Sequence, residues 1–133
     1  MANNTQQNLQ LQKIHTTWFM LKLTYGLVSI IAGADKFLNL LTNWEVYLNP
    51  ALLNIAPLSA IHFLYLVGLI EIIAGLIILS DYTRYGAYIV ALWLIAIAVN
   101  LITLGFYDIA VRDVVMAIGA LALAQLTEVL ESK

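Results

Sequence analysis

Cysteine is absent from this chain, and charged residues are scarce. Without cysteine, the 133 residues form no disulfide bond, perform no thiol catalysis and offer no cysteine-ligated zinc or iron–sulfur centre. Only 11% of the residues are charged and the formal net charge is -2, so the chain lacks the basic surface that binds nucleic acid. The sequence also lacks a Gly-rich phosphate loop, an H-E-x-x-H zinc motif and a Ser-His-Asp arrangement. No nucleophile and base can be named, so enzymatic activity stays an open question.

Apolar residues are abundant instead. They make up 62% of the chain, and its mean hydropathy is +0.90, whereas about 45 to 50% is typical of soluble domains. Four apolar runs, at 18–41, 59–80, 85–106 and 109–126, each approach the roughly 20 residues that a membrane-spanning helix needs. Short connections after the second and third runs make consecutive helices antiparallel neighbours. The sequence predicts an all-α, four-transmembrane-helix, up-down-up-down bundle at 18–127, with a mobile polar leader at 1–17 and a polar tail at 128–133.

The connection between the first two runs is longer and contains Pro50 and Pro57. Aromatic and leucine residues alternate there with asparagine and glutamate, which favours a short amphipathic segment lying at the lipid headgroups. An ordinary ordered loop is the alternative.

Lysine and arginine near the predicted helix ends indicate the orientation. The side that holds both termini carries Lys13, Lys22, Arg84 and Lys133, whereas the opposite side carries Lys36 and Arg112. This excess favours both termini in the cytoplasm. Lys22 inside the first apolar run argues against a cleaved signal peptide.

Ionisable and amide residues gather near the outer helix ends, on the side away from the termini. Six of them lie within roughly 10 Å of those ends at 1.5 Å rise per residue: Asp35, Lys36, His62, Asn100, Arg112 and Asp113. Glu71 lies deeper, roughly 18 Å from the outer end, where a carboxylate needs a partner, a cavity or a proton. Arg112 is the predicted partner of Asp35 or Glu71, because its planar guanidinium binds a carboxylate with two hydrogen bonds. Alternatively, these charged residues only lie near helix ends, where their side chains extend to water.

Small residues flank Glu71. Gly68, Glu71 and Gly75 share one helix face, and Gly26 and Gly33 form a similar stripe in the first run. Such a face admits a neighbouring helix or a flat ligand close to the backbone, with Glu71 as its polar contact. Close packing of helices, and nothing more, is the alternative.

His62 has two interpretations. It is a candidate proton carrier or hydrogen-bond donor to a quinone, or it is an interfacial histidine beside Trp44 and Tyr65. A haem held by two histidines is not expected, because His15 lies on the other side of the membrane.

Three segments carry a family resemblance. They read YGLVSIIAGADKF, GLIEIIAGL and RDVVMAIGALALA, and the similarity covers 21–126. In these segments the chain resembles the DoxX-like family of small four-helix membrane proteins. The family pattern matches at Gly26, Gly33 and Lys36, at Gly68, Glu71 and Gly75, and at Arg112 and Asp113.

The resemblance implies a function. Members are linked to quinone-coupled oxidation of sulfur compounds and to membrane redox-stress complexes, often beside a partner subunit. We therefore expect a membrane-embedded subunit or accessory protein of a redox complex in a bacterial cytoplasmic membrane. The expected partners are the lipid bilayer, other membrane or redox subunits and further copies of the chain, and a quinone is the one cofactor considered. The alternatives are a small-solute or proton transporter and a purely structural or assembly protein.

Overall fold

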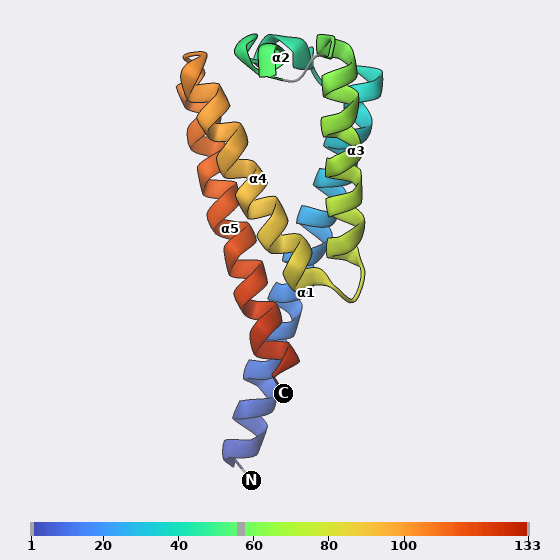
Figure 1. The fold of residues 1–133 in the computed structure, drawn as a ribbon. Helices are drawn as coiled ribbons and strands as arrows, with labels where there is room; N and C mark the ends of the chain where they lie inside the picture. Colours follow the sequence, from blue (N-terminus) through green and yellow to red (C-terminus); the bar gives the residue numbers. More distant parts are fainter. Residues whose placement is uncertain (1, 56–57, 133) are drawn as a thin grey trace.

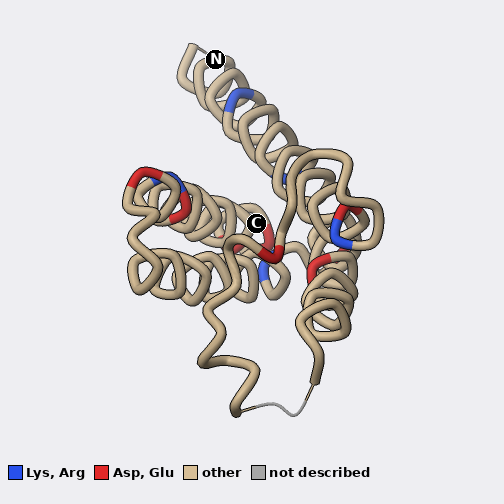
Figure 2. The backbone as a smooth tube through the Cα atoms, turned by 90° about the horizontal axis from the view of Figure 1, so that it is seen from above, with Lys and Arg blue, Asp and Glu red and all other residues tan. Residues whose placement is uncertain are grey.

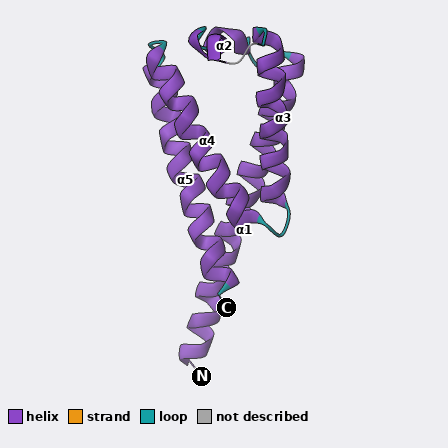
Figure 3. Cartoon of the chain, viewed as in Figure 1, coloured by secondary structure: helices purple, strands orange, loops and turns teal. Residues whose placement is uncertain are grey.

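The computed structural model describes residues 2–55 and 58–132, and this part of the chain contains helices and no strand. Figure 3 shows the helices and the short loops that join them. The elements are α1 (Ala2–Leu38), the 3-10 helix η1 (Trp44–Tyr47), α2 (Ala51–Ile55), α3 (Ala60–Leu79), α4 (Thr83–Thr103) and α5 (Tyr107–Glu131). The four long helices are each long and apolar enough to cross a membrane. The predicted all-α four-helix fold is confirmed, and Pro57 lies outside the described residues.

The long helices form two antiparallel pairs. Helix α1 packs mainly on α3, and α4 packs mainly on α5. Figure 1 shows that the pairs meet near the end that holds both termini and diverge toward the other end, where η1 and α2 lie. We call the diverging end the outer end and the opposite end the inner end. In the view from above, charged residues occupy only short stretches of the backbone (Figure 2).

Small side chains fill the core between the pairs. The main buried cluster combines residues from three helices: Ala74, Ile78, Ala87, Val90, Ala91, Ala120, Leu123 and Ala124. Trp18, Leu21 and Tyr25 of α1 pack against it. Large apolar side chains are mostly exposed instead, as expected where lipid tails replace water around the helices. This distribution is that of an integral membrane protein.

The helix boundaries differ from the expected ones mainly at the termini. The first helix begins at Ala2 and not at residue 18, so the described part of the predicted mobile leader is continuous with α1. That leader contains neither glycine nor proline, so nothing in it interrupts the backbone hydrogen bonds of the helix. Helix α5 likewise continues to Glu131, which makes most of the predicted polar tail helical. By contrast, α3 matches its expected range and is capped by Ser59 and Ser80.

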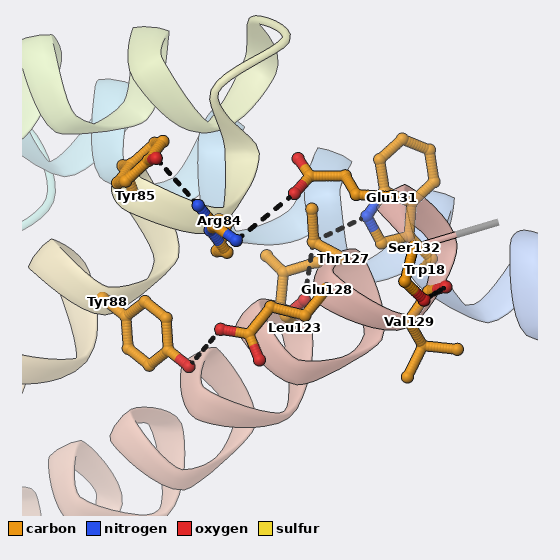
Figure 4. A network of polar contacts seen from close by, with 10 residues as sticks. All are labelled: Trp18, Arg84, Tyr85, Tyr88, Leu123, Thr127, Glu128, Val129, Glu131 and Ser132. Atoms are coloured by element: carbon orange, nitrogen blue, oxygen red, sulfur yellow. Dashed lines mark hydrogen bonds and ion pairs between the residues drawn. The ribbon is translucent and has the colours of Figure 1, made fainter.

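Polar contacts at the inner end connect three of the long helices (Figure 4). The Trp18 indole nitrogen of α1 donates to the Thr127 hydroxyl of α5 at 2.8 Å. Between α4 and α5, the Tyr88 hydroxyl donates to Glu128 Oε1 at 2.7 Å, and Arg84 pairs with Glu131 at 3.7 Å. These contacts fix the end where the two pairs meet, and they leave the outer end to be held by other residues.

Asn100 holds the outer connection against α4. Its Nδ2 donates to the Tyr47 carbonyl at 2.6 Å, and its Oδ1 accepts from the Asn49 backbone nitrogen at 3.2 Å. The Tyr47 ring packs edge-on against Phe106, with ring centroids 5.0 Å apart. The connection thus contains the two short helices η1 and α2, and Asn100 holds its Tyr47–Asn49 part against α4.

Replacing Asn100 with alanine should loosen this connection. The variant loses both hydrogen bonds to the segment, each of which leaves a partly buried backbone group without its partner, at roughly 1 to 3 kcal/mol. Hydrogen–deuterium exchange should become faster at 44–49 and stay unchanged in α3. Asn54→Ala, at an exposed position of α2, is the matched control. Equal exchange in both variants would show that Asn100 does not hold the segment.

Candidate functional site

Glycines bring α1 and α3 unusually close together. A Cβ atom added at Gly33 would lie 2.5 Å from the Gly68 carbonyl oxygen, and one added at Gly75 would lie 2.6 Å from the Gly26 carbonyl oxygen. The predicted glycine faces of the two helices therefore pack against each other within one chain. The face around Gly68 and Gly75 is filled by α1, so it is not a free surface for a partner helix or a flat ligand.

This close approach allows a buried ion pair between α1 and α3. Lys36 Nζ lies 2.6 Å from Glu71 Oε2, and the two residues are only 6% and 9% exposed. Glu71 therefore has the partner that its depth requires. The partner is Lys36, however, and not the predicted Arg112: Arg112 is exposed and makes no hydrogen bond or ion pair within 2–55 and 58–132.

Two indole rings complete the surroundings of the ion pair. The Lys36 ammonium lies over the Trp44 ring, 3.8 Å from its centroid, within the range of a favourable cation–π contact. The Trp93 indole nitrogen of α4 donates to Glu71 Oε1 at 3.4 Å. Each carboxylate oxygen of Glu71 thus has a donor, one from α1 and one from α4.

Asp35 lies near the end of α1 and accepts hydrogen bonds from the turn that follows the helix. Its carboxylate accepts hydrogen bonds from the backbone nitrogens of Leu40 and Leu41 and from the Trp44 indole, at 2.8 to 3.1 Å. Asn39, at φ 53, turns the chain out of the helix, a left-handed position that asparagine tolerates better than most residues. Asp35 therefore caps the turn after α1 and orients Trp44 over Lys36.

Asp113 adds a second carboxyl from the other helix pair. It is buried, at 7% exposed, and it makes no hydrogen bond to any residue that the structure describes. It is close enough to interact electrostatically with both Glu71 and Lys36, being repelled by the first and attracted by the second. We call Lys36, Glu71, Asp113, Trp44 and Trp93 the ionic cluster.

The remaining predicted residues lie apart from the ionic cluster. His62 is exposed in the first turn of α3, where its Nδ1 lies 2.6 Å from the Ser59 hydroxyl and its ring stands edge-on to Tyr65. Asn100 serves the connection, as described above. Trp93 was missed by the sequence reasoning, although a tryptophan in the middle of an apolar run, 22 positions after Glu71, was a signal that it needed a hydrogen-bond partner.

The chemistry of the ionic cluster follows from its charges. It contains two carboxyl groups and one ammonium in surroundings from which water is largely excluded, so full ionisation leaves one uncompensated negative charge. The described residues contain no group of three or more histidines, aspartates or glutamates that fits a metal ion. The charged groups and the indole N–H groups of the cluster are hydrogen-bond donors and acceptors.

The fold and this cluster define a class: an integral membrane protein of four long helices with a buried ionic cluster between two helix pairs. No protein-family profile, curated protein or solved structure matches the chain.

Proposed function

We propose that this chain is a DoxX-like membrane-embedded subunit or accessory protein of a quinone-linked redox complex. In this proposal the protein lies in a bacterial cytoplasmic membrane with both termini in the cytoplasm, and the ionic cluster is its polar contact for a hydrophobic ligand. The observation that carries the proposal is the buried Lys36–Glu71 pair with the second carboxyl of Asp113 beside it. Structural helices alone do not require such a cluster, because buried ion pairs contribute little net stability.

A quinone headgroup matches the chemistry of the ionic cluster. Its carbonyl oxygens need hydrogen-bond donors, and the Lys36 ammonium has N–H groups beyond the one that it directs at Glu71. Its reduction consumes protons, which carboxyl groups deliver. Its isoprenoid tail needs an apolar path, and the outward faces of the long helices are apolar and exposed. The glycine face is filled by α1, so the proposed contact is the cluster where the two helix pairs diverge.

A transport path is less well supported. A proton relay needs successive titratable groups across the membrane, whereas the main core toward the inner end is built from alanine, isoleucine, leucine and valine. The Tyr25 hydroxyl in that region donates to the Met116 carbonyl at 2.7 Å. This core gives the cluster no continuation toward the inner end by carboxyl, imidazole or amine groups.

Purification of the tagged chain from its native membranes in mild detergent tests the proposal. Mass spectrometry should identify a quinone or a redox subunit bound in stoichiometric amount. Trp93→Phe, which keeps one aromatic ring and removes the donor to Glu71, should lower the bound amount several-fold, whereas Arg112→Gln should not change it. Recovery of a monodisperse chain with neither quinone nor partner would overturn the proposal.

A further inference from the structure

We propose that a phospholipid with a zwitterionic headgroup binds in a groove between α4 and α5 at the outer end. Its headgroup carries a phosphate on the glycerol side and a primary ammonium beyond it. The proposal does not depend on the proposed redox role, because it concerns an outward-facing surface and not the ionic cluster.

The groove has an apolar lining. Its volume is about 280 Å³, and six residues line it: Ile102, Tyr107, Ala110, Val111, Val114 and Val115. Ala110 is buried, whereas Val111 and Val115 are 63% and 62% exposed, so the groove opens outward. Both helices are apolar enough to cross a membrane, where lipid tails surround them in place of water. An acyl chain is therefore the occupant whose chemistry fits this lining.

Two charged residues of α5 border the groove. Arg112 lies about 100° around the helix from Val111 and about 60° from Val115. Asp108 lies at the same two angles from Tyr107 and Val111, about 100° and about 60°. Both side chains are exposed, and neither makes a hydrogen bond or an ion pair with any residue that the structure describes. They stand four positions apart, a spacing at which opposite charges can pair, yet both remain available to a ligand.

The order of these charges matches the order of groups in the lipid. Asp108 and Arg112 are the second and sixth residues of α5, so they lie roughly 2 Å and roughly 8 Å from its outer end at 1.5 Å per residue. Val114 and Val115 lie deeper still. The lipid likewise runs from its ammonium through its phosphate to its acyl chains, which places the ammonium at Asp108 and the phosphate at Arg112.

Each charge has a suitable partner in this headgroup. The planar guanidinium of Arg112 binds phosphate oxygens with two parallel hydrogen bonds. The Asp108 carboxylate accepts from the ammonium N–H groups, which a quaternary ammonium lacks. A purely anionic headgroup satisfies Arg112 and leaves Asp108 beside a second negative charge. The pair of opposite charges therefore favours an ethanolamine headgroup over a glycerol or a choline headgroup.

Native mass spectrometry of the full chain released from lipid nanodiscs tests the proposal. The nanodiscs contain equal amounts of phosphatidylethanolamine, phosphatidylglycerol and phosphatidylcholine. The wild-type protein should retain one phosphatidylethanolamine per chain in preference to the other two. Arg112→Gln should lower the retained amount about fivefold, the effect expected of one basic residue on lipid phosphate at a membrane surface. Val115→Trp, which fills the groove from an exposed position, should abolish retention of all three lipids.

A second substitution tests the headgroup assignment separately. Asp108→Asn removes the charge that faces the ammonium and keeps the phosphate contact, so phosphatidylglycerol should now be retained as well as phosphatidylethanolamine. Glu45→Gln and Lys13→Gln, at exposed positions of η1 and α1, remove charges outside the groove and should retain lipid as the wild type does. Three results would rule the proposal out: a wild type without lipid preference, unchanged retention in Arg112→Gln or Val115→Trp, or a lipid-free dimer that Val115→Trp dissociates.

Discussion

Replacing Lys36 with methionine is expected to destabilise the protein by roughly 3 to 5 kcal/mol, the range for breaking a buried ion pair from one side. The change leaves the Glu71 carboxylate buried without its cation, and it also removes the contact with the Trp44 ring. Methionine is close to lysine in length and volume, so packing changes little. Reversible unfolding in mild detergent, followed by tryptophan fluorescence, measures the loss.

A double-mutant cycle isolates the ion pair from packing. Lys36→Met combined with Glu71→Leu removes both charges and should recover most of the lost stability, because apolar residues of similar volume often replace a buried pair without loss. Arg112→Met, at an exposed position of α5, should change stability by no more than about 0.5 kcal/mol. If the double variant is as unstable as Lys36→Met, the buried charge of Glu71 is not the cause of the loss.

Substituting Gly33 with alanine is the second change with a large expected effect. The new Cβ would lie 2.5 Å from the Gly68 carbonyl oxygen and 3.0 Å from the Ile72 backbone nitrogen. Backbone atoms cannot rotate away, so α1 and α3 must separate, at roughly 1 to 3 kcal/mol for an overpacked site. The separation also lengthens the 2.6 Å contact between Lys36 and Glu71.

Gly119→Ala is the matched control for this substitution. Its Cβ would meet the hydroxyl of Tyr25, which is the far end of a side chain and can move. The cost is the hydrogen bond from Tyr25 to the Met116 carbonyl, about 1 kcal/mol. The same detergent unfolding measurement compares the two alanine variants. Equal losses in both would contradict a backbone-limited contact between α1 and α3.

The four-helix fold could be predicted from the sequence because bilayer thickness sets a length that apolar runs must reach. The start of α1 could not be predicted in the same way. Hydropathy marks the residues that can lie in lipid, whereas a helix ends where its backbone hydrogen bonds are interrupted. Nothing between Ala2 and Trp18 interrupts them, so the helix begins far ahead of the apolar run.

The candidate site could be predicted in part. The depth of Glu71 alone indicated that it needs a partner, and the partner lies on α1. The prediction that Arg112 is the partner of Asp35 or Glu71 was wrong. Arg112 and Asp113 are about 100° apart around a helix of 3.6 residues per turn, so they face different surroundings. Only one of them is buried in the protein, and it is Asp113. The path of the connection brings Trp44 to the site, and the crossing of α4 brings Trp93 there. No local sequence pattern specifies either arrangement.

The polar start of α1 gives the protein a built-in spacer. From Ala2 to Thr17 the helix rises roughly 24 Å at 1.5 Å per residue, and Figure 1 shows that it extends past the C-terminus as a single unsupported rod. A molecule that binds the N-terminal end of this helix is held at a fixed distance from the lipid headgroups. Because the helix is continuous, a tilt of α1 within the bilayer also moves its N-terminal end. A dye attached near Ala2 should therefore report motion at the α1–α3 contact, as a change in the distance between the dye and the membrane surface.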